Sequence, residues 1–182
     1  MSIVTFPVRT KMIGIIALGG GATNALCHGY ETNQLQPMKS VVLDLEKSKS
    51  IPNASDFITL DHDAKNAVVE AFSNFETVHI IAGLGGKTGS TIEQVSSLLK
   101  RHGVNVIPLI ILPFKFEGQA RLTKAEQIKQ RLMSQYSVVY CFDNESILAT
   151  LGKGRSLLDG FKACNDEIIT AINCPTLSGN RL

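Results

Sequence analysis

Apolar runs rich in β-branched residues alternate with segments of helical periodicity along almost the whole chain. The strand-like runs are MIGIIAL, SVVLDL, VHIIAG, NVIPLIIL and SVVYCF. Helical segments separate or follow them, beginning at about Asn24 and covering Asp63 to Phe75, Ser90 to His102, Thr123 to Met133 and Ser156 to Asn173. Strands that are apolar at nearly every position are covered on both faces, and strands that alternate with helices pair in parallel. The sequence therefore predicts a three-layer α/β fold, with a mostly parallel sheet and helices on both of its faces.

The size and charge of the chain are those of an ordinary globular protein. Its 182 residues, 44% of them hydrophobic and 19% charged, suit one packed domain over residues 1–182. The net charge of +2 comes without a cluster of lysine or arginine, so no basic patch for nucleic acid or anionic lipid is expected. The segment after Met1 lacks a signal-peptide core, and the longest apolar run, Val104 to Pro113, is too short to span a bilayer. We expect a cytoplasmic protein that binds neither nucleic acid nor membrane.

Cysteine and histidine spacing does not favour a metal site. Cys27, Cys141, Cys164 and Cys174 form no CxxC pair and have no histidine at ligand spacing, which indicates reduced structural thiols. Asp61, His62 and Asp63 are consecutive at the start of a predicted helix, so their side chains point in different directions. We interpret these acidic residues as helix caps rather than metal ligands.

Two glycine-rich segments join a predicted strand to a predicted helix. The first is LGGGATNAL, Leu18 to Leu26, which fits the dinucleotide pattern GxGxxG only in part because Asn24 takes the third glycine position. The second is AGLGGKTGST, Ala82 to Thr91, which is not a P-loop because Ile81 stands where that pattern needs its first glycine. Each could simply be a tight turn. Both nevertheless lie at the carboxyl edge of the sheet, where backbone N–H groups at helix N-termini could surround a di- or triphosphate.

The same edge should receive polar and aromatic residues that follow the later strands and begin the last helix. PFKFEGQAR carries Glu117 and Arg121, Asn144 follows SVVYCF, and the last helix carries Phe161 and Asp166. These residues offer a carboxylate and a cation for a sugar or phosphate, an amide and a carboxylate for a base edge, and a ring for stacking. A solvated ion pair between Glu117 and Arg121, and core packing of Phe161, are the simpler alternatives.

Read in order, these segments resemble the nucleotide-binding domain of the FtsZ/tubulin family. GGKTGST, Gly85 to Thr91, matches the family loop GGGTGTG, and GGGATN, Gly19 to Asn24, matches GGGGGN. PFKFEGQAR matches PFxFEGxxR, and NESILATLGKGRSLLDGFKACND, Asn144 to Asp166, matches NxxxLxxLGxGxSLLDxFxxxND. The resemblance extends from about Met12 to Asn173 and is closer to FtsZ than to eukaryotic tubulin.

The resemblance implies a guanine-nucleotide site that takes GTP or GDP, with magnesium held mainly by the phosphates and water. The residues that it places at the phosphates are Gly19, Gly20, Gly21, Ala22, Thr23, Asn24, Gly85, Gly86, Lys87, Thr88, Gly89 and Ser90. Those at the sugar and base are Glu117, Arg121, Asn144, Phe161 and Asp166. A carboxylate can accept hydrogen bonds from the N1–H and N2–H groups of guanine together, a donor pair that adenine lacks.

The chain also departs from the family pattern around the phosphates. The polar stretch Glu46 to Ser55, a predicted mobile loop, lies where FtsZ has a longer segment with an AGxNP loop at the γ-phosphate. Asp44-Leu45-Glu46 replaces the family's Asn-Thr-Asp, and Lys87 replaces a glycine. We hypothesise that the Lys87 ammonium compensates charge near the β- and γ-phosphates, the alternative being a surface lysine that points into water.

A further departure concerns hydrolysis. The family's NxDxxD loop, whose acids complete the site of the next subunit, does not occur after Asn173, so we expect this chain to lack the family's C-terminal activation domain. The first hypothesis is a guanine-nucleotide-binding protein with weak GTPase activity, or a regulator that caps filaments, with full-length FtsZ or itself as partner. A degenerate module that keeps the fold without binding nucleotide is the second hypothesis. A nicotinamide-dependent oxidoreductase, supported by the glycine loops alone, is the third.

Overall fold

The computed structural model describes residues 10–36, 38–46, 55–152 and 154–173. Within them lies one six-stranded sheet with the order β3-β2-β1-β4-β5-β6, in which every neighbouring pair is parallel. The strands are β1 (Thr10–Leu18), β2 (Ser40–Asp44), β3 (Ser55–Thr59), β4 (Phe75–Gly83), β5 (Asn105–Leu112) and β6 (Tyr140–Asp143). The parallel sheet predicted from the sequence is confirmed.

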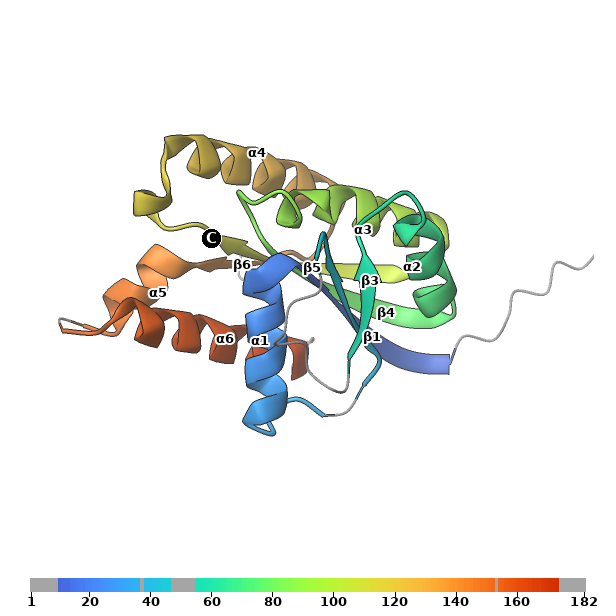
Figure 1. Cartoon of the computed structure of the whole chain (residues 1–182), viewed down its shortest axis with the longest axis horizontal. Coiled ribbons are helices and arrows are strands. Elements are labelled where there is room, and N and C mark those ends of the chain that lie inside the picture. The colour runs from blue at the N-terminus through green and yellow to red at the C-terminus, as the bar shows by residue number, and fades with distance from the viewer. Residues whose placement is uncertain (1–9, 37, 47–54, 153, 174–182) are drawn as a thin grey trace, which may run out of the picture.

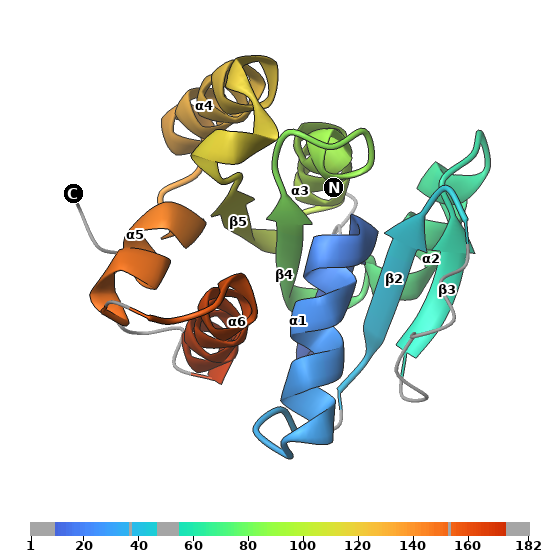
Figure 2. The same cartoon turned by 60° about the vertical axis from the view of Figure 1, so that its left-hand side comes forward.

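Helices cover both faces of this sheet, as Figures 1 and 2 show. The helices are α1 (Gly19–Glu31), α2 (Ala64–Phe72), α3 (Ile92–Arg101), α4 (Gln119–Gln135), α5 (Asn144–Thr150) and α6 (Leu157–Asn173), with 3₁₀ turns η1 (Gly89–Thr91) and η2 (Lys115–Glu117). Helices α2, α3 and α4 share one apolar cluster with the sheet, whereas α1, α5 and α6 share the other. The predicted three-layer arrangement is therefore confirmed.

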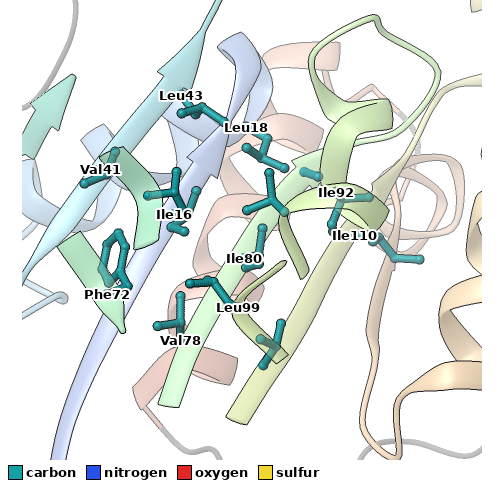
Figure 3. Packing of buried hydrophobic residues seen from close by; sticks show 14 of the residues in the cluster. Ile16, Leu18, Val41, Leu43, Phe72, Val78, Ile80, Ile92, Leu99 and Ile110 are labelled. Atoms are coloured by element: carbon teal, nitrogen blue, oxygen red, sulfur yellow. The ribbon is translucent and has the colours of Figure 1, made fainter. Parts of the chain in front are cut away.

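The pleat of the central strands supplies both clusters at once. On β1, Ile16 and Leu18 face α2 and α3, whereas Ile15 and Ala17 face the layer that contains α1 and α6. Figure 3 shows the first cluster, where Phe72 packs over the sheet. Because both faces are buried, these strands are apolar at nearly every position.

The order of the strands reverses between β1 and β4, which places a crevice at their carboxyl ends. From β1 the chain passes through α1 on one face to β2, and from β4 it passes through α3 on the opposite face to β5. The first turns of α1 and α3 therefore lie on opposite sides of the sheet. In open parallel sheets, ligands bind at this reversal point.

Several boundaries differ from the sequence predictions. Helix α1 begins at Gly19 rather than near Asn24, because packing of its apolar face against the sheet outweighs the low helix propensity of glycine. The helix predicted to reach Phe75 ends at Phe72, and Phe75 begins β4. Of the predicted run SVVYCF only the last three residues belong to β6, which begins at Tyr140 and ends at Asp143.

Two elements were not predicted. Strand β3 is a partly exposed edge strand that begins at Ser55, inside the predicted polar loop, and residues 47–54 of that loop lie outside the described residues. Helix α5 is short and follows β6 directly, capped by Asp143, whose side chain accepts a hydrogen bond from the Glu145 N–H group.

The remaining local predictions concern cysteines, caps and membrane segments. Cys27, Cys141 and Cys164 form no disulfide, and Cys174 lies outside the described residues. Asp61 acts as a cap, since its Oδ1 atom accepts hydrogen bonds from the N–H groups of Asp63 and Ala64 at 2.9 and 3.2 Å. None of the helices in the described ranges is long and apolar enough to cross a membrane.

Candidate nucleotide site

A cavity of about 820 Å³ opens at the carboxyl edge of the sheet, where the strand order reverses. Its walls come from one side of α1 along its whole length, the loop between β4 and η1, the ends of β2 and β5, η2, and the starts of α4, α5 and α6. Ligand pockets of proteins commonly have 300–1,000 Å³, roughly this size. Twelve predicted site residues line it: Gly19, Gly20, Gly21, Asn24, Gly86, Lys87, Thr88, Gly89, Glu117, Arg121, Asn144 and Phe161.

Five other predicted residues do not line the cavity: Ala22, Thr23, Gly85, Ser90 and Asp166. Ala22 is buried in the core beneath α1. The Thr23 hydroxyl donates to the Gly19 carbonyl at 3.0 Å, and the Ser90 hydroxyl donates to the Gly86 carbonyl at 2.5 Å. In this structure these two hydroxyls therefore hydrogen-bond to backbone carbonyls of the glycine loops.

The two glycine loops meet at one end of the cavity, which we call the phosphate end. Gly19 has a φ of +80°, and a Cβ atom there would lie 3.3 Å from the Thr88 Cβ atom. A Cβ atom on Gly89 would lie 1.9 Å from the Gly83 carbonyl oxygen, so only glycine fits this close backbone approach. Added Cβ atoms on Gly20, Gly21 and Gly86 would meet no other atom within 4 Å. The loops thus contact each other yet leave open space in front of their backbones.

The first turn of α1 presents backbone N–H groups without a competing side chain. Leu18, at the N-cap, makes no side-chain hydrogen bond to this turn, and the turn contains no acidic residue. The first N–H groups of a helix have no partner within the helix, and its dipole is positive at this end. The glycine run therefore forms a surface suited to an anion.

One acidic side chain also reaches the phosphate end. The Thr88 hydroxyl donates a hydrogen bond to Asp44 Oδ1 at 2.7 Å, which joins the second glycine loop to the end of β2. Both residues line the cavity. The sequence motifs marked Asp44 only as a departure from the family pattern, whereas the structure places its carboxylate against the second glycine loop.

Glu117 and Arg121 form the wall next to the second glycine loop. Arg121 Nη1 donates to Glu117 Oε2 at 2.9 Å, and Glu117 Oε1 accepts a hydrogen bond from the Phe114 N–H group at 2.8 Å. The predicted ion pair therefore forms, and both of its members line the cavity. A β-carbon on Gly85 would lie 3.1 Å from the Arg121 Cβ atom, so this loop also contacts α4 closely.

Aromatic rings line the cavity near α6. Phe161 is 45% exposed, and its ring lies edge-on to Phe114 with centroids 5.4 Å apart. Phe116 is 66% exposed and stacks on Phe114 at 5.0 Å. Phe116 was missed in the sequence, although it lies inside the PFKFEGQAR motif. Exposed rings around a cavity offer a face for stacking on a planar ligand.

A buried residue, Asn144, lines the other end of the cavity, which we call the base end. Asn144 is 4% exposed, and its Oδ1 atom has no hydrogen-bond partner among the described residues. His28, Lys162 and Asn165 line this region as well, although none of them was predicted. His28 lies one helical turn after Asn24 on α1, which is the signal that could have identified it.

Asp166 lies beside the base end and contacts His28. The Asp166 Oδ1 atom is 2.7 Å from His28 Nε2, and the two side chains are 50% and 20% exposed. His28 therefore stands at the wall of the cavity with the Asp166 carboxylate next to it.

The cavity also contains two thiols. Cys27 and Cys164 both line it. Burial raises the pKa of Cys164 to about 12 and also raises the pKa of Cys27. Both therefore stay protonated near neutral pH, and neither behaves as a reactive thiolate.

The fold and the cavity define a doubly wound α/β domain with a cavity where two glycine-rich loops meet. The chain belongs to the Tubulin/FtsZ family: the family model described as "Tubulin/FtsZ family, GTPase domain" matches residues 54–152, more than half of its length. This match confirms the resemblance seen in the motifs.

Individual relatives agree with this assignment. The cell division protein FtsZ of Wigglesworthia glossinidia brevipalpis is 27% identical, and the match covers 88% of this chain and 47% of that protein. The chain spans about half the length of the curated relatives that it matches.

Solved structures share the fold. The FtsZ dimer of M. jannaschii has a TM-score of 0.74 at 18% identity, covering 95% of this chain and 57% of the other. CetZ2 from Haloferax volcanii has a TM-score of 0.66 at 20% identity, covering 90% of this chain and 57% of the other.

Proposed function

We propose that the cavity binds a guanine nucleotide, GTP or GDP, with its phosphates between the glycine loops and its base near Asn144. The observation that carries this proposal is the cavity itself, which the two contacting glycine loops, Asn144 and Phe161 line together at the carboxyl edge of the sheet. A purine base near Asn144 would lie beside an amide that can exchange hydrogen bonds with its edge.

The dimensions and polarity of the cavity support the same proposal. Phe161 and Phe116 expose ring surface beside Asn144, which suits a planar base. The open helix end and the glycine backbones stand at the other end, which suits phosphate. The family match to a GTPase domain favours guanine, and the Asp166 carboxylate beside the base end fits its paired N–H donors.

The charges of the cavity indicate how the phosphates would be neutralised. The cavity is lined by three cationic side chains, Lys87, Arg121 and Lys162. It is also lined by three acidic side chains, Glu31, Asp44 and Glu117, so the formal charges balance. Lys87 lines the phosphate end and is exposed, which supports its proposed role near the β- and γ-phosphates. Asp44 and Thr88 carry the oxygen ligands that magnesium prefers, and a magnesium ion bound there would neutralise phosphate charge.

We propose only slow hydrolysis by this domain alone. The NxDxxD pattern occurs nowhere in residues 1–182, and the family resemblance assigns activation of water to its acids. Loss of positioned groups of this kind costs several orders of magnitude in the rate of phosphoryl transfer. An activating loop from full-length FtsZ would complete the site, and docking there suits a regulator or capper of FtsZ-type filaments.

The alternative is a module that keeps the fold and binds no nucleotide. The observations that favour it are the hydrogen bond between Thr88 and Asp44 and the engagement of Asp166 by His28. In each bond a residue expected to bind a nucleotide, Thr88 or Asp166, is engaged by another side chain of the protein.

Calorimetric titration with GTP, GDP and ATP in magnesium buffer separates the two functions. We expect binding of GTP and GDP, with ATP weaker by about 100-fold or more. Asn144→Leu should weaken GDP binding by about tenfold, since it removes the base-edge acceptor. Asn66→Leu, at an exposed position on α2, is the matched control and should bind like the parent. No heat with any nucleotide would establish the module function.

Hydrolysis needs its own measurement. GTP turnover should be near background for the protein alone and should rise after full-length FtsZ is added, beyond the rate of that FtsZ alone. Equal rates in the mixture and in the sum of the separate proteins would contradict completion of the site by a partner.

A further inference from the structure

The hydrogen bond between His28 and Asp166 joins two helices with different parts in the proposed site. Helix α1 begins with the first glycine loop, and α6 carries Phe161 at the base end. His28 Nε2 and Asp166 Oδ1 are 2.7 Å apart although 138 residues separate them in sequence. The pair therefore connects the helix of the phosphate end to the helix of the base end.

Close packing of α1 against α6 places the two side chains together. A Cβ atom on Gly29 would lie only 2.5 Å from Ile169 Cδ1, so glycine allows this contact between the helices. His28 is adjacent to Gly29 on α1, and Asp166 lies about one turn before Ile169 on α6. The helices that carry the two side chains are thus tightly packed beside this contact.

The contact also determines which partner donates the hydrogen bond and which accepts it. An ionised carboxylate is only an acceptor, so Nε2 of His28 carries the proton that it donates. This bond uses Oδ1 of Asp166, and its other oxygen has no hydrogen-bond partner among the described residues. Lys162 lies four residues before Asp166 on the same helix, at a spacing where opposite charges attract. In this structure Asp166 bonds to His28, a residue that lines the cavity, which holds the carboxylate beside it.

We propose that His28 is a positioning residue that sets guanine selectivity, by holding the Asp166 carboxylate where it can accept from the N1–H and N2–H groups of the base. This inference rests on the proposed function, because it names how that same site distinguishes its base. Without His28, the carboxylate is free to turn toward Lys162 or water, and the selectivity is lost even where overall nucleotide binding persists.

A double-mutant cycle on base selectivity tests this role. GDP is compared with inosine diphosphate, which lacks the 2-amino group, so the ratio of the two affinities reports the contact to N2–H. We expect the parent to favour GDP by about tenfold, Asp166→Asn to reduce that ratio to about one, and His28→Leu to reduce it several-fold. The double variant should be no worse than Asp166→Asn, because both changes remove the same contact.

Conservative and control variants distinguish positioning from packing. His28→Gln keeps an N–H donor of similar reach and should retain the parent ratio, whereas His28→Asn is too short and should lose it. His62→Leu, at an exposed site before α2, should leave the ratio unchanged. Thermal unfolding of each variant reports any loss of helix packing, which by itself would not alter the ratio.

The outcomes separate the two proposals. If the parent binds GDP but His28→Leu and His28→Asn keep its GDP preference, the role of His28 is overturned and the proposed function stands. If selectivity losses add in the double variant, His28 acts independently of Asp166 and the positioning role is wrong. If the parent binds no guanine nucleotide, both proposals are overturned.

Discussion

The carboxylate of Asp44 accepts a hydrogen bond from the hydroxyl of Thr88 at 2.7 Å, and both residues line the phosphate end of the cavity. The bond holds the second glycine loop against the end of β2. It also places a negative charge next to the loops proposed to hold phosphate. The proposed ligand is itself anionic, so this residue should make binding depend on a cation.

Asp44→Asn should reduce the dependence of nucleotide binding on magnesium. The amide can still accept from Thr88, whereas the repulsion between the carboxylate and the phosphates disappears. Two like charges about 5 Å apart repel by roughly 1–3 kcal/mol at a protein surface, so GDP affinity in EDTA should rise about tenfold. Affinities of a fluorescent GDP analogue with EDTA and with magnesium measure the effect. Glu76→Gln, an exposed acid near the amino end of β4, is the charge-matched control.

Lys87→Ala should weaken GTP binding more than GDP binding. The ammonium lines the phosphate end on an exposed stem, and the γ-phosphate adds charge that it can neutralise. We expect about a tenfold loss for GTP and a smaller loss for GDP, by titration calorimetry of both nucleotides. Lys124→Ala, exposed on α4, should change neither affinity. Equal affinities for Lys87→Ala and the parent would remove Lys87 from the site.

Gly89→Ala should damage the second glycine loop, whereas Gly86→Ala should be tolerated by the fold. The added methyl group at Gly89 would overlap the Gly83 carbonyl oxygen, and the one at Gly86 would enter open space. We expect a loss of about 2–4 kcal/mol in the free energy of unfolding for Gly89→Ala and less than about 1 kcal/mol for Gly86→Ala. Urea unfolding followed by circular dichroism provides both values. Equal stabilities would mean that the backbones of Gly83 and Gly89 are not in close contact.

Stability should fall in mild acid because of His79. This side chain is fully buried on β4, neither ring nitrogen has a hydrogen-bond partner among the described residues, and burial lowers its pKa from 6.5 to about 4. Above about pH 6.5 the ring is neutral in both states, so its titration has no effect. As the pH falls from about 6.5 to about 4, the unfolded chain gains a proton that the folded chain excludes, which favours unfolding.

The expected contribution is a loss of about 2 kcal/mol in the free energy of unfolding between about pH 7 and pH 5. His79→Leu should remove this part of the pH dependence and should raise stability near neutral pH, because two unpaired buried nitrogens disappear. Urea unfolding at both pH values measures the difference, with His62→Leu as an exposed control. Equal acid sensitivity of the parent and His79→Leu would exclude His79 as the cause.

The family and the general position of the site were readable before any coordinates. Apolar strands covered on both faces leave a strong local pattern, and GGGATN, GGKTGST and PFKFEGQAR identified three segments of the cavity wall. The pattern of apolar residues was weak in two elements. These are β3, a half-exposed edge strand, and α5, which has only a short apolar face. Those two elements were missed.

The direction of individual side chains was not predicted from the motifs. Thr23 and Ser90 belong to the predicted motifs, yet their hydroxyls bond to loop carbonyls. Asp44 and His28 were not among the predicted site residues. Both line the cavity, because β2 and α1 place them at its edge. The contacts of Thr23 and Ser90 are local, four residues apart, whereas those of Asp44 and His28 pair residues brought together only by the sheet order and by the approach of α1 to α6.

The amino-acid sequence by itself determined the α/β alternation, the family and which loops meet at one edge of the sheet, because periodicity and turn chemistry act over short stretches of chain. Tertiary structure alone decided which side chains enter the cavity and that Thr88 pairs with Asp44 and His28 with Asp166. Those contacts depend on helix rotation and on glycine-permitted close packing, which are properties of the assembled layers.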